Sequence, residues 1–181
     1  MTFAELLKTR QSVRQYDPKP VEEEKLEQLI EAVRLSPSAS NSQPWKLVVV
    51  DEPELRARVA QATFSAAFAF NRFSLGAPVI VVFCVEKAGL VTQVGGFLKM
   101  RPYYLIDIGI AAAHFCLQAA ELGLGTCMLG WFDEKKIKRL LGIPRANRIG
   151  LLVTLGYPAE GDRAREKTRK AADRISRFNR Y

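Results

Sequence analysis

The feature that most constrains this 181-residue chain is an apolar helix predicted over residues 103–122. Its few polar side chains are seven, four and three residues apart, so they form one narrow stripe of Asp107, His114, Gln118 and Glu121. Nearly every other residue of the segment is apolar or small. A helix that is apolar around most of its circumference is buried on several sides. In a chain of this length, that pattern favours the core helix of a dimer over that of a monomer.

Shorter helices and strands intermix on both sides of this helix. Helices are predicted over residues 3–11, 22–35, 54–62, 64–73 and 134–141, and strands over 45–50, 79–85, 126–129 and 149–155. The run at 79–85 is continuously apolar and rich in β-branched residues, which is typical of a strand buried on both faces. The segment between residues 85 and 103 is interpreted as a short glycine-containing link. The order of elements predicts one domain, residues 1–181, with a sheet covered by helices.

Cysteine and histidine are too scarce for a disulfide framework or a metal site. The three cysteines, Cys84, Cys116 and Cys127, are far apart and form no CxxC pair, so no disulfide framework is expected. With only one histidine, no metal site is expected either. We interpret His114 as a packing or hydrogen-bonding residue rather than a catalyst.

No membrane or export signal is recognised. The longest uninterrupted apolar stretch, residues 77–85, is too short to cross a bilayer. The N-terminus, Met-Thr-Phe-Ala-Glu, lacks the basic start and apolar core of a signal peptide. A cytoplasmic location is therefore the default expectation.

The chain is basic, with 27 Lys and Arg against 19 Asp and Glu and a net charge of +8. Residues 160–181 contain eight Lys or Arg and four Asp or Glu, so this tail holds half of the excess. A basic excess is compatible with nucleic acid, a membrane surface or a phosphorylated small molecule as partner. A nucleic-acid-binding module is thus one hypothesis, but no helix-turn-helix, RNA-recognition or zinc motif supports it.

The first candidate binding segment is Arg10-Gln11-Ser12-Val13-Arg14. In extended backbone, alternate residues point to the same side, so Arg10, Ser12 and Arg14 would converge. Two guanidinium groups and a hydroxyl suit a phosphate or the edge of an electron-rich heterocycle. The alternative is a solvated basic loop.

The second candidate is the loop at residues 36–45, Ser-Pro-Ser-Ala-Ser-Asn-Ser-Gln-Pro-Trp. Four serines, an asparagine and a glutamine between two prolines offer many neutral donors and acceptors on a stiffened backbone. Such a loop suits hydrogen bonding to a polar ring or a sugar-like chain. The alternative is an ordinary turn.

Two further segments are weaker candidates. In residues 124–133, Gly130 allows a ligand to approach the backbone closely, although the segment also fits a buried strand and a plain loop. The motifs GxGxxG and GxxxxGK[ST] are both absent. In the tail, the alternating cations of Lys167-Thr168-Arg169-Lys170 suit a phosphate clamp, and the alternative is a solubilising tail.

Together, in chain order, these segments resemble the FMN-dependent nitroreductase family. The match covers essentially the whole chain, and the set of motifs is specific although no single one is. The motifs that carry the resemblance are Arg10-x-Ser12-x-Arg14, the loop at 36–45, Asn71, Asp107-Ile108-Gly109, Gly123-Leu124-Gly125-Thr126, Gly130-Trp131-Phe132-Asp133, Gly156-Tyr157-Pro158 and Lys167-x-Arg169.

The resemblance implies a homodimer of α+β subunits with a layered α/β/α fold, in which helices flank a central, mostly antiparallel sheet. FMN would lie in clefts at the dimer interface. The implied reaction is a two-step, ping-pong hydride transfer, in which NADH or NADPH reduces FMN and a small oxidised acceptor, such as a nitroaromatic or a quinone, then takes the electrons. Because the flavin carries the chemistry, no catalytic side chain is expected.

The resemblance also implies roles for individual residues. Arg10 and Ser12 look like phosphate and ribityl contacts, joined by Lys167 and Arg169 from a tail that packs on the FMN site or on the partner subunit. Arg14 and Asn71 resemble partners of the pyrimidine edge of the ring. The Ser38, Ser40 and Asn41 contacts would come from the other subunit, and the Gly130 N–H would lie near flavin N5. The full implied set is Arg10, Gln11, Ser12, Arg14, Ser38, Ser40, Asn41, Gln43, Asn71, Met128, Leu129, Gly130, Trp131, Lys167 and Arg169.

The chain departs from the family pattern at one position near the ring. Ser74 stands where many relatives carry a lysine, and Arg72 is a candidate replacement. Trp131 and Tyr103 are candidate linings of the acceptor pocket. The alternatives to an enzyme are a flavin-binding protein without turnover and the basic nucleic-acid-binding module.

Overall fold

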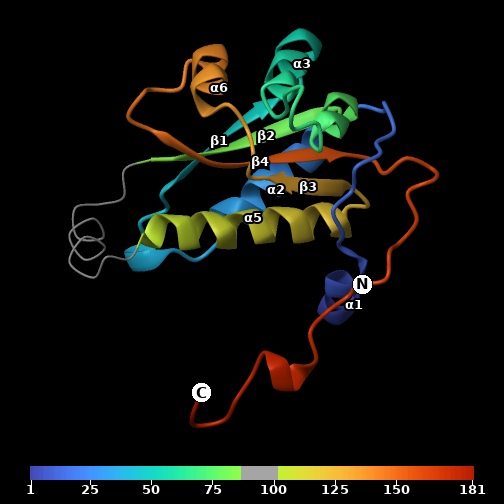
Figure 1. The fold of residues 1–181 in the computed structure, drawn as a ribbon, viewed down its shortest axis with the longest axis vertical. Helices are drawn as coiled ribbons and strands as arrows, with labels where there is room; N and C mark the ends of the chain where they lie inside the picture. Colours follow the sequence, from blue (N-terminus) through green and yellow to red (C-terminus); the bar gives the residue numbers. More distant parts are fainter. Residues whose placement is uncertain (87–101) are drawn as a thin grey trace.

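The computed structural model describes residues 1–86 and 102–181 and is built around a twisted antiparallel sheet (Figure 1). Within these residues the sheet has four strands, in the order β1 (Trp45–Val50), β2 (Val79–Val85), β4 (Arg148–Gly156) and β3 (Gly125–Leu129). Each neighbouring pair is antiparallel. The predicted antiparallel sheet is confirmed. The link predicted between residues 85 and 103 lies mostly outside the described residues.

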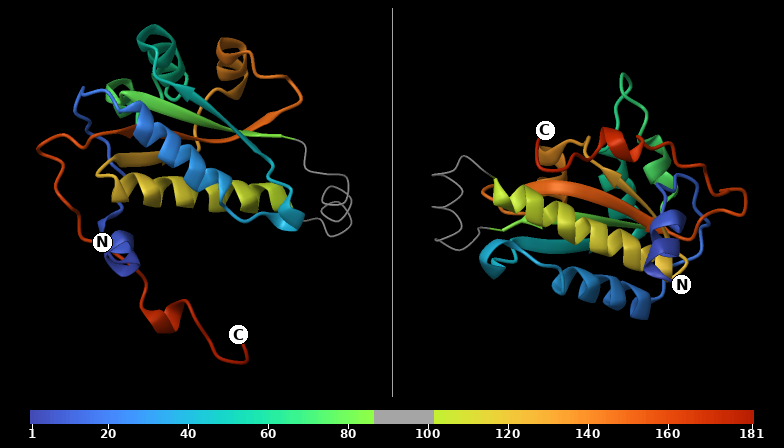
Figure 2. Two further views of the ribbon diagram at one scale, coloured as in Figure 1. Left: turned by 180° about the vertical axis from the view of Figure 1, so that it is seen from behind. Right: turned by 90° about the horizontal axis from the view of Figure 1, so that it is seen from below.

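Helices cover both faces of the sheet, as Figures 1 and 2 show. On one face, α2 (Glu23–Arg34) and α5 (Tyr103–Glu121) lie side by side, and α1 (Phe3–Thr9) contacts α5. On the other face lie α3 (Pro53–Gln61) and α6 (Glu134–Leu141). The layered α/β/α arrangement of an α+β fold is therefore confirmed.

Strand β2 explains why residues 79–85 form an unbroken apolar run. Phe83 packs on the side of α5, where its ring lies 5.7 Å from that of Phe115, edge to face. Its neighbours Val82 and Cys84 point to the opposite core, together with Ile137 of α6. A strand covered by helices on both faces needs apolar side chains in both directions.

The helix predicted over residues 64–73 is wrong. The structure has turns there, followed by a short 3₁₀ segment, η2 (Arg72–Gly76). Ser65 closes one of the turns, because its backbone N–H donates to Phe68 O at 3.0 Å and its Oγ accepts from Phe68 N at 3.2 Å. Serine competes with helix formation in this way. The rings of Phe68 and Phe70 stay exposed rather than forming an apolar helix face.

Helix α5 is buried along one side only. Its core-facing side includes Ala111 and Phe115, whereas Leu105 and Ile106 are 50% and 55% exposed. The predicted polar stripe varies in burial along its length, because Asp107 is buried while His114 is exposed. Within the described residues α5 is the one helix long and apolar enough to cross a bilayer, but 39% of it is buried inside the protein. Its outer side is therefore an apolar surface that one chain leaves uncovered.

The C-terminal tail returns to the N-terminal segment after β4. Tyr16 and Pro158 form a bridge, and Ala159 N donates to Gln15 O at 3.0 Å. The tail then passes α1 and ends away from the body of the domain (Figure 1). Its last apolar side chains, Ile175 and Phe178, are 72% and 92% exposed.

Candidate functional site

The N-terminal segment lies along the outer edge of β3. Ser12 forms a parallel bridge with Thr126, and Val13 N donates to Thr126 O at 2.9 Å. The close approach depends on Gly125, because a Cβ there would lie 2.6 Å from Val13 Cγ2. An alternating, strand-like segment is therefore fixed against the sheet.

This segment presents Arg10, Ser12 and Arg14 to the same part of the sheet. Burial raises the pKa of the Cys127 thiol, and Arg14, Ser12, Arg165 and Arg10 all oppose that rise. A cation or hydrogen-bond donor lowers the pKa of a thiol only when it lies near it. The structure therefore gathers these side chains around one strand position.

The tail adds two cations to this group. Lys167 Nζ donates to Leu7 O at 2.8 Å, to Arg10 O at 2.7 Å and to Lys8 O. Burial and the neighbouring charges of Arg10 and Arg169 lower the pKa of Lys167. Among the ion pairs of the described residues, none includes any of these three cations. This cluster of like charges would be stabilised by an anion.

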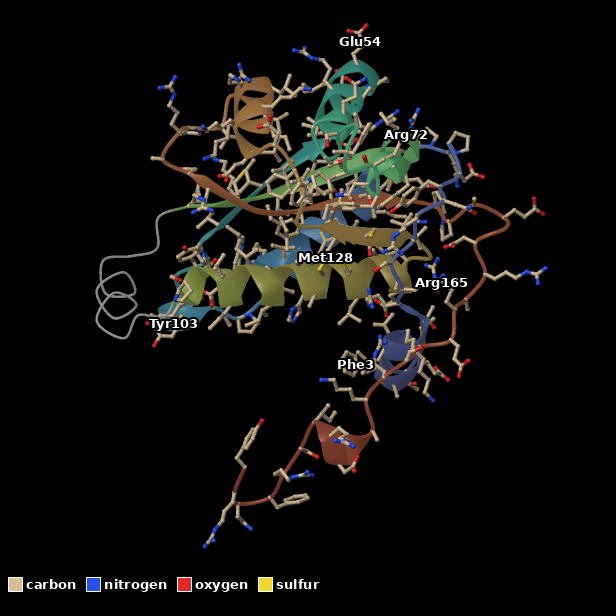
Figure 3. The ribbon with its side chains drawn as sticks, in the orientation of Figure 1. Phe3, Glu54, Arg72, Tyr103, Met128 and Arg165 are labelled. Carbon is tan, nitrogen blue, oxygen red and sulfur yellow. The ribbon has the colours of Figure 1, made fainter. Side chains whose placement is uncertain are left out.

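Gln11 holds the tail rather than facing the cationic cluster. Its Nε2 donates to Asp162 Oδ2 at 3.4 Å and to Arg163 O at 3.2 Å, and its Oε1 accepts from Arg165 N at 2.9 Å. The Arg165 side chain also donates to Ser12 O. Arg165, at the right of Figure 3, was missed by the sequence analysis. Its spacing of two residues from Lys167 was the available signal.

The segment after β3 offers an exposed backbone. Met128 and Trp131 are 42% and 50% exposed, and a Cβ at Gly130 would meet nothing within 4 Å. Leu129 is buried in the core, so only its backbone belongs to this surface. Asn71 Nδ2 donates to Trp131 O at 3.1 Å and to Thr63 O at 3.2 Å, which fixes the position of the segment.

Two aromatic rings missed by the sequence analysis lie against Trp131. Its ring centroid is 4.9 Å from that of Phe68 and 6.1 Å from that of Phe70. Exposed apolar surface of this kind marks a binding site in many proteins. The Phe-x-Phe pattern directly before Asn71 was the available signal.

Ser74 does not belong to this surface. It is buried, and its Oγ lies 3.0 Å from Thr63 Oγ1. Arg72 is exposed near the N-terminal segment (Figure 3), and its role as a replacement stays a prediction. The Arg14 guanidinium lies 5.7 Å from the centre of the Phe73 ring, a contact that positions it.

The polar loop at residues 38–43 lies apart from the cationic cluster. It contacts the first part of α5, where Ala39 N donates to Asp107 Oδ1 at 3.0 Å. Inside the loop, Ser38 Oγ accepts from Gln43 N at 2.9 Å, and Gln43 Nε2 donates to Asn41 Oδ1 at 3.2 Å. Ser40 lies between them with a left-handed backbone.

Within one chain, the loop and the cationic cluster lie toward opposite ends of α5. A cavity of about 230 Å³ beside Arg10 is also lined by Ala120, near the end of α5. Asp107 and Ala120 are 13 positions apart on this helix, which corresponds to about 20 Å. Tyr103 lies at the same distant end, well away from Arg165 (Figure 3). The structure thus separates the predicted site residues into two groups.

Gly125 and Gly130 provide a matched test of the geometry of β3. A Gly125→Ala side chain collides with Val13, so we expect the free energy of unfolding to fall by about 1–3 kcal/mol, as in other overpacked sites. A Gly130→Ala side chain enters open space, and we expect a change below about 0.5 kcal/mol. Chemical denaturation of the cofactor-free protein measures both. Equal destabilisation by the two variants would contradict the described packing.

The comparisons with known proteins agree with this fold. A model of the nitroreductase family matches residues 7–157. A protein of Archaeoglobus fulgidus is 31% identical over 179 residues, which cover 95% of each chain. The oxygen-insensitive NADPH nitroreductase of Helicobacter acinonychis is 28% identical over 92% of this chain and 91% of the relative. The FMN-dependent nitroreductase of Clostridium difficile is 26% identical and superposes with a TM-score of 0.79, over 97% of this chain and 98% of that chain.

These findings define the class of protein as an α+β oxidoreductase. More particularly, the chain belongs to the nitroreductase family. The family assignment made from the sequence motifs is therefore confirmed.

Proposed function

We propose that the protein is a homodimeric oxidoreductase that uses bound FMN to transfer a hydride from NADH or NADPH to a small oxidised acceptor. The observation that carries this proposal is the cluster of Arg10, Lys167 and Arg169 on a segment that lies along β3, the strand that leads to the open backbone of Gly130. A phosphate would bind the cationic cluster, and a flat ring would lie on the open backbone. Both features fit FMN, which joins a phosphate to an aromatic ring system.

The phosphate would be held by the cationic cluster. Arg10, Lys167 and Arg169 already lie close enough to disfavour the charge on Lys167. Charge-assisted hydrogen bonds to a phosphate would relieve this repulsion. Ser12, on the same side of its segment, would supply a neutral donor to the ribityl chain or the phosphate.

The ring would lie on the Met128–Trp131 backbone, with Arg14 and Asn71 at its pyrimidine edge. Bound FMN supplies the hydride chemistry, so the protein needs no nucleophile of its own. A guanidinium is a fixed cation, and such a charge favours added negative charge on a neighbouring ring. Arg14 therefore has two roles, in affinity and in raising the reduction potential.

The acceptor would stack on the aromatic surface formed by Phe68, Phe70 and Trp131. These rings are half-exposed and lie beside the segment that would hold the flavin. Offset or tilted aromatic contacts favour flat, electron-poor molecules. Nitroaromatics and quinones are flat and accept electrons, so we propose one of these two classes as substrate.

A second copy of the chain would complete the site. The exposed apolar side of α5 supplies a surface that needs cover, and loop 38–43 lies at the end of α5 opposite to the cationic cluster. Antiparallel packing of two α5 helices would bring the loop of one subunit to the cluster of the other. Ser38, Ser40, Asn41 and Gln43 would then contact the partner's FMN.

We further propose that residues 1–181 form one domain whose tail, residues 160–181, crosses the FMN site and reaches the partner subunit. The contacts of Gln11 and Lys167 with the N-terminal segment support this path. A cytoplasmic location fits the three cysteines, which are all buried and unbridged.

Arg14→Ala tests the function directly. The loss of one charge-assisted contact, worth about 1.5–3 kcal/mol, should weaken FMN binding by about 10- to 100-fold and lower the reduction potential of the bound flavin. Fluorescence titration and spectroelectrochemistry measure the two effects. Arg58→Ala, an exposed arginine on α3, is the matched control and should change neither.

FMN binding by the wild type, followed by addition of NADH or NADPH, separates the alternative functions. A folded wild-type protein that binds no FMN would overturn the proposed function. Bound FMN that neither NADH nor NADPH bleaches would indicate a flavin-binding protein without turnover.

A further inference from the structure

Asp107 of α5 is a buried carboxylate to which none of the roles above assigns a purpose. The residue is 3% exposed. Its Oδ1 accepts the hydrogen bond from Ala39 N, but Oδ2 is buried and receives no hydrogen bond from any described residue. Burial of a carboxylate with an unpartnered oxygen is unfavourable. Since an apolar residue would pack there at lower cost, the carboxylate points to a requirement other than stability.

The loop that Asp107 contacts is strained. Ser40, Asn41 and Gln43 have φ values of 52°, 53° and 44°, in the left-handed region that residues with a side chain rarely adopt. In the described chain, only Asn179 in the tail is a further non-glycine residue of this kind. Such conformations persist where the surroundings hold them, and they occur most often at functional sites.

The contact between Asp107 and the loop is a single, well-defined hydrogen bond. The 3₁₀ turn η1 (Ala39–Asn41) begins at the residue whose N–H binds Asp107 Oδ1. Ser38, immediately before it, is extended, with φ −145° and ψ 158°. The carboxylate therefore binds the loop at Ala39, directly before the left-handed residues Ser40 and Asn41.

We propose that Asp107 is a positioning residue that acts on the active site of the partner subunit. By accepting the Ala39 N–H, it holds loop 38–43 in the shape that contacts FMN across the dimer interface. The same helix that presents the apolar surface to the second copy thus also shapes the loop that reaches it. This inference rests on the proposed function, because it requires FMN and two copies of the chain.

Two substitutions isolate the hydrogen bond. Asp107→Ala removes the acceptor and should weaken FMN binding about tenfold or more, since it leaves the part-buried Ala39 N–H without its partner. Asp107→Asn keeps an oxygen at the Oδ1 position and should stay within about threefold of the wild type. Circular dichroism and ultracentrifugation would show whether both variants remain folded dimers. Equal FMN affinity in the wild type and Asp107→Ala, or equal losses in both variants, would overturn the inference.

A mixed dimer shows on which subunit Asp107 acts. Asp107→Ala and Arg14→Ala chains, co-expressed with different tags, give a species purified through both tags. If Asp107 serves the partner's site, one site has both defects and the other has none, so the mixed dimer should bind about one FMN with wild-type affinity. A role within its own chain leaves one defect in each site, and no high-affinity binding would be recovered.

The mixed dimer also distinguishes a functional defect of the Asp107→Ala chain from a folding defect. A merely structural defect in the Asp107→Ala chain would not disappear when the partner carries Arg14→Ala. Failure of wild-type protein to bind FMN would contradict the proposed function. Wild-type binding without recovery in the mixed dimer would contradict only the role of Asp107.

Discussion

Removal of residues 160–181 is expected to lower the affinity for FMN by about 100-fold or more. The truncation removes Lys167 and Arg169 together with Arg165, which ties the tail to Ser12. Two lost charge-assisted contacts of about 1.5–3 kcal/mol each correspond to at least that factor. Fluorescence titration at fixed ionic strength measures the change. Riboflavin, which lacks the phosphate, should lose much less affinity than FMN.

A shorter truncation serves as the control for this experiment. Removal of residues 172–181 keeps the cations of the cluster and deletes the exposed end with Ile175 and Phe178. Its FMN affinity should stay closer to that of the wild type. If the longer truncation retained wild-type flavin content, the tail would be a solubilising segment with no part in the site.

Ile106→Glu is expected to convert the dimer to a monomer that lacks FMN. Ile106 is 55% exposed on the outer side of α5, where the proposed interface would desolvate the new carboxylate. Two copies of the charge would be introduced, one from each subunit. Because each site would take loop 38–43 from the partner, FMN binding should be lost with the dimer. Light scattering and absorbance of the bound flavin measure the two results.

Gln61→Glu places a comparable charge on α3, at the opposite face of the sheet, and should leave both the dimer and the flavin unchanged. An Ile106→Glu protein that remained dimeric would show that this side of α5 is not the interface. A monomer with wild-type FMN affinity would exclude loop 38–43 from the site.

Much of the fold was predictable because local patterns and burial coincide. Strand β2 is apolar on both faces, so its sequence pattern and its position between two helical layers agree. The 64–73 segment fails for the opposite reason: its alanine and phenylalanine content fits a helix, but the bonds of Ser65 close a turn. The composition of the segment does not show that this turn forms in place of the helix.

The candidate site was predictable in pieces rather than as a whole. The alternation of Arg10, Ser12 and Arg14 is a local property of extended backbone, and the structure retains it. The contact of Phe68 with Trp131 and the burial of Asp107 depend on chain segments far apart in sequence. Periodicity placed Asp107 in one stripe with His114, but helical spacing does not show what covers each part of that stripe, and the loop at Ala39 contacts Asp107.

The hydrogen bonds between Gln11 and residues 162–165 have a consequence for the order of events during biosynthesis. Gln11 contacts residues that are synthesised about 150 positions later, so these two distant segments form one structural unit. In the proposed site, Lys167 and Arg169 join Arg10 only after translation has passed them. A nascent chain would therefore acquire its flavin only after residue 169 has been synthesised, and premature termination near residue 160 would yield a colourless protein.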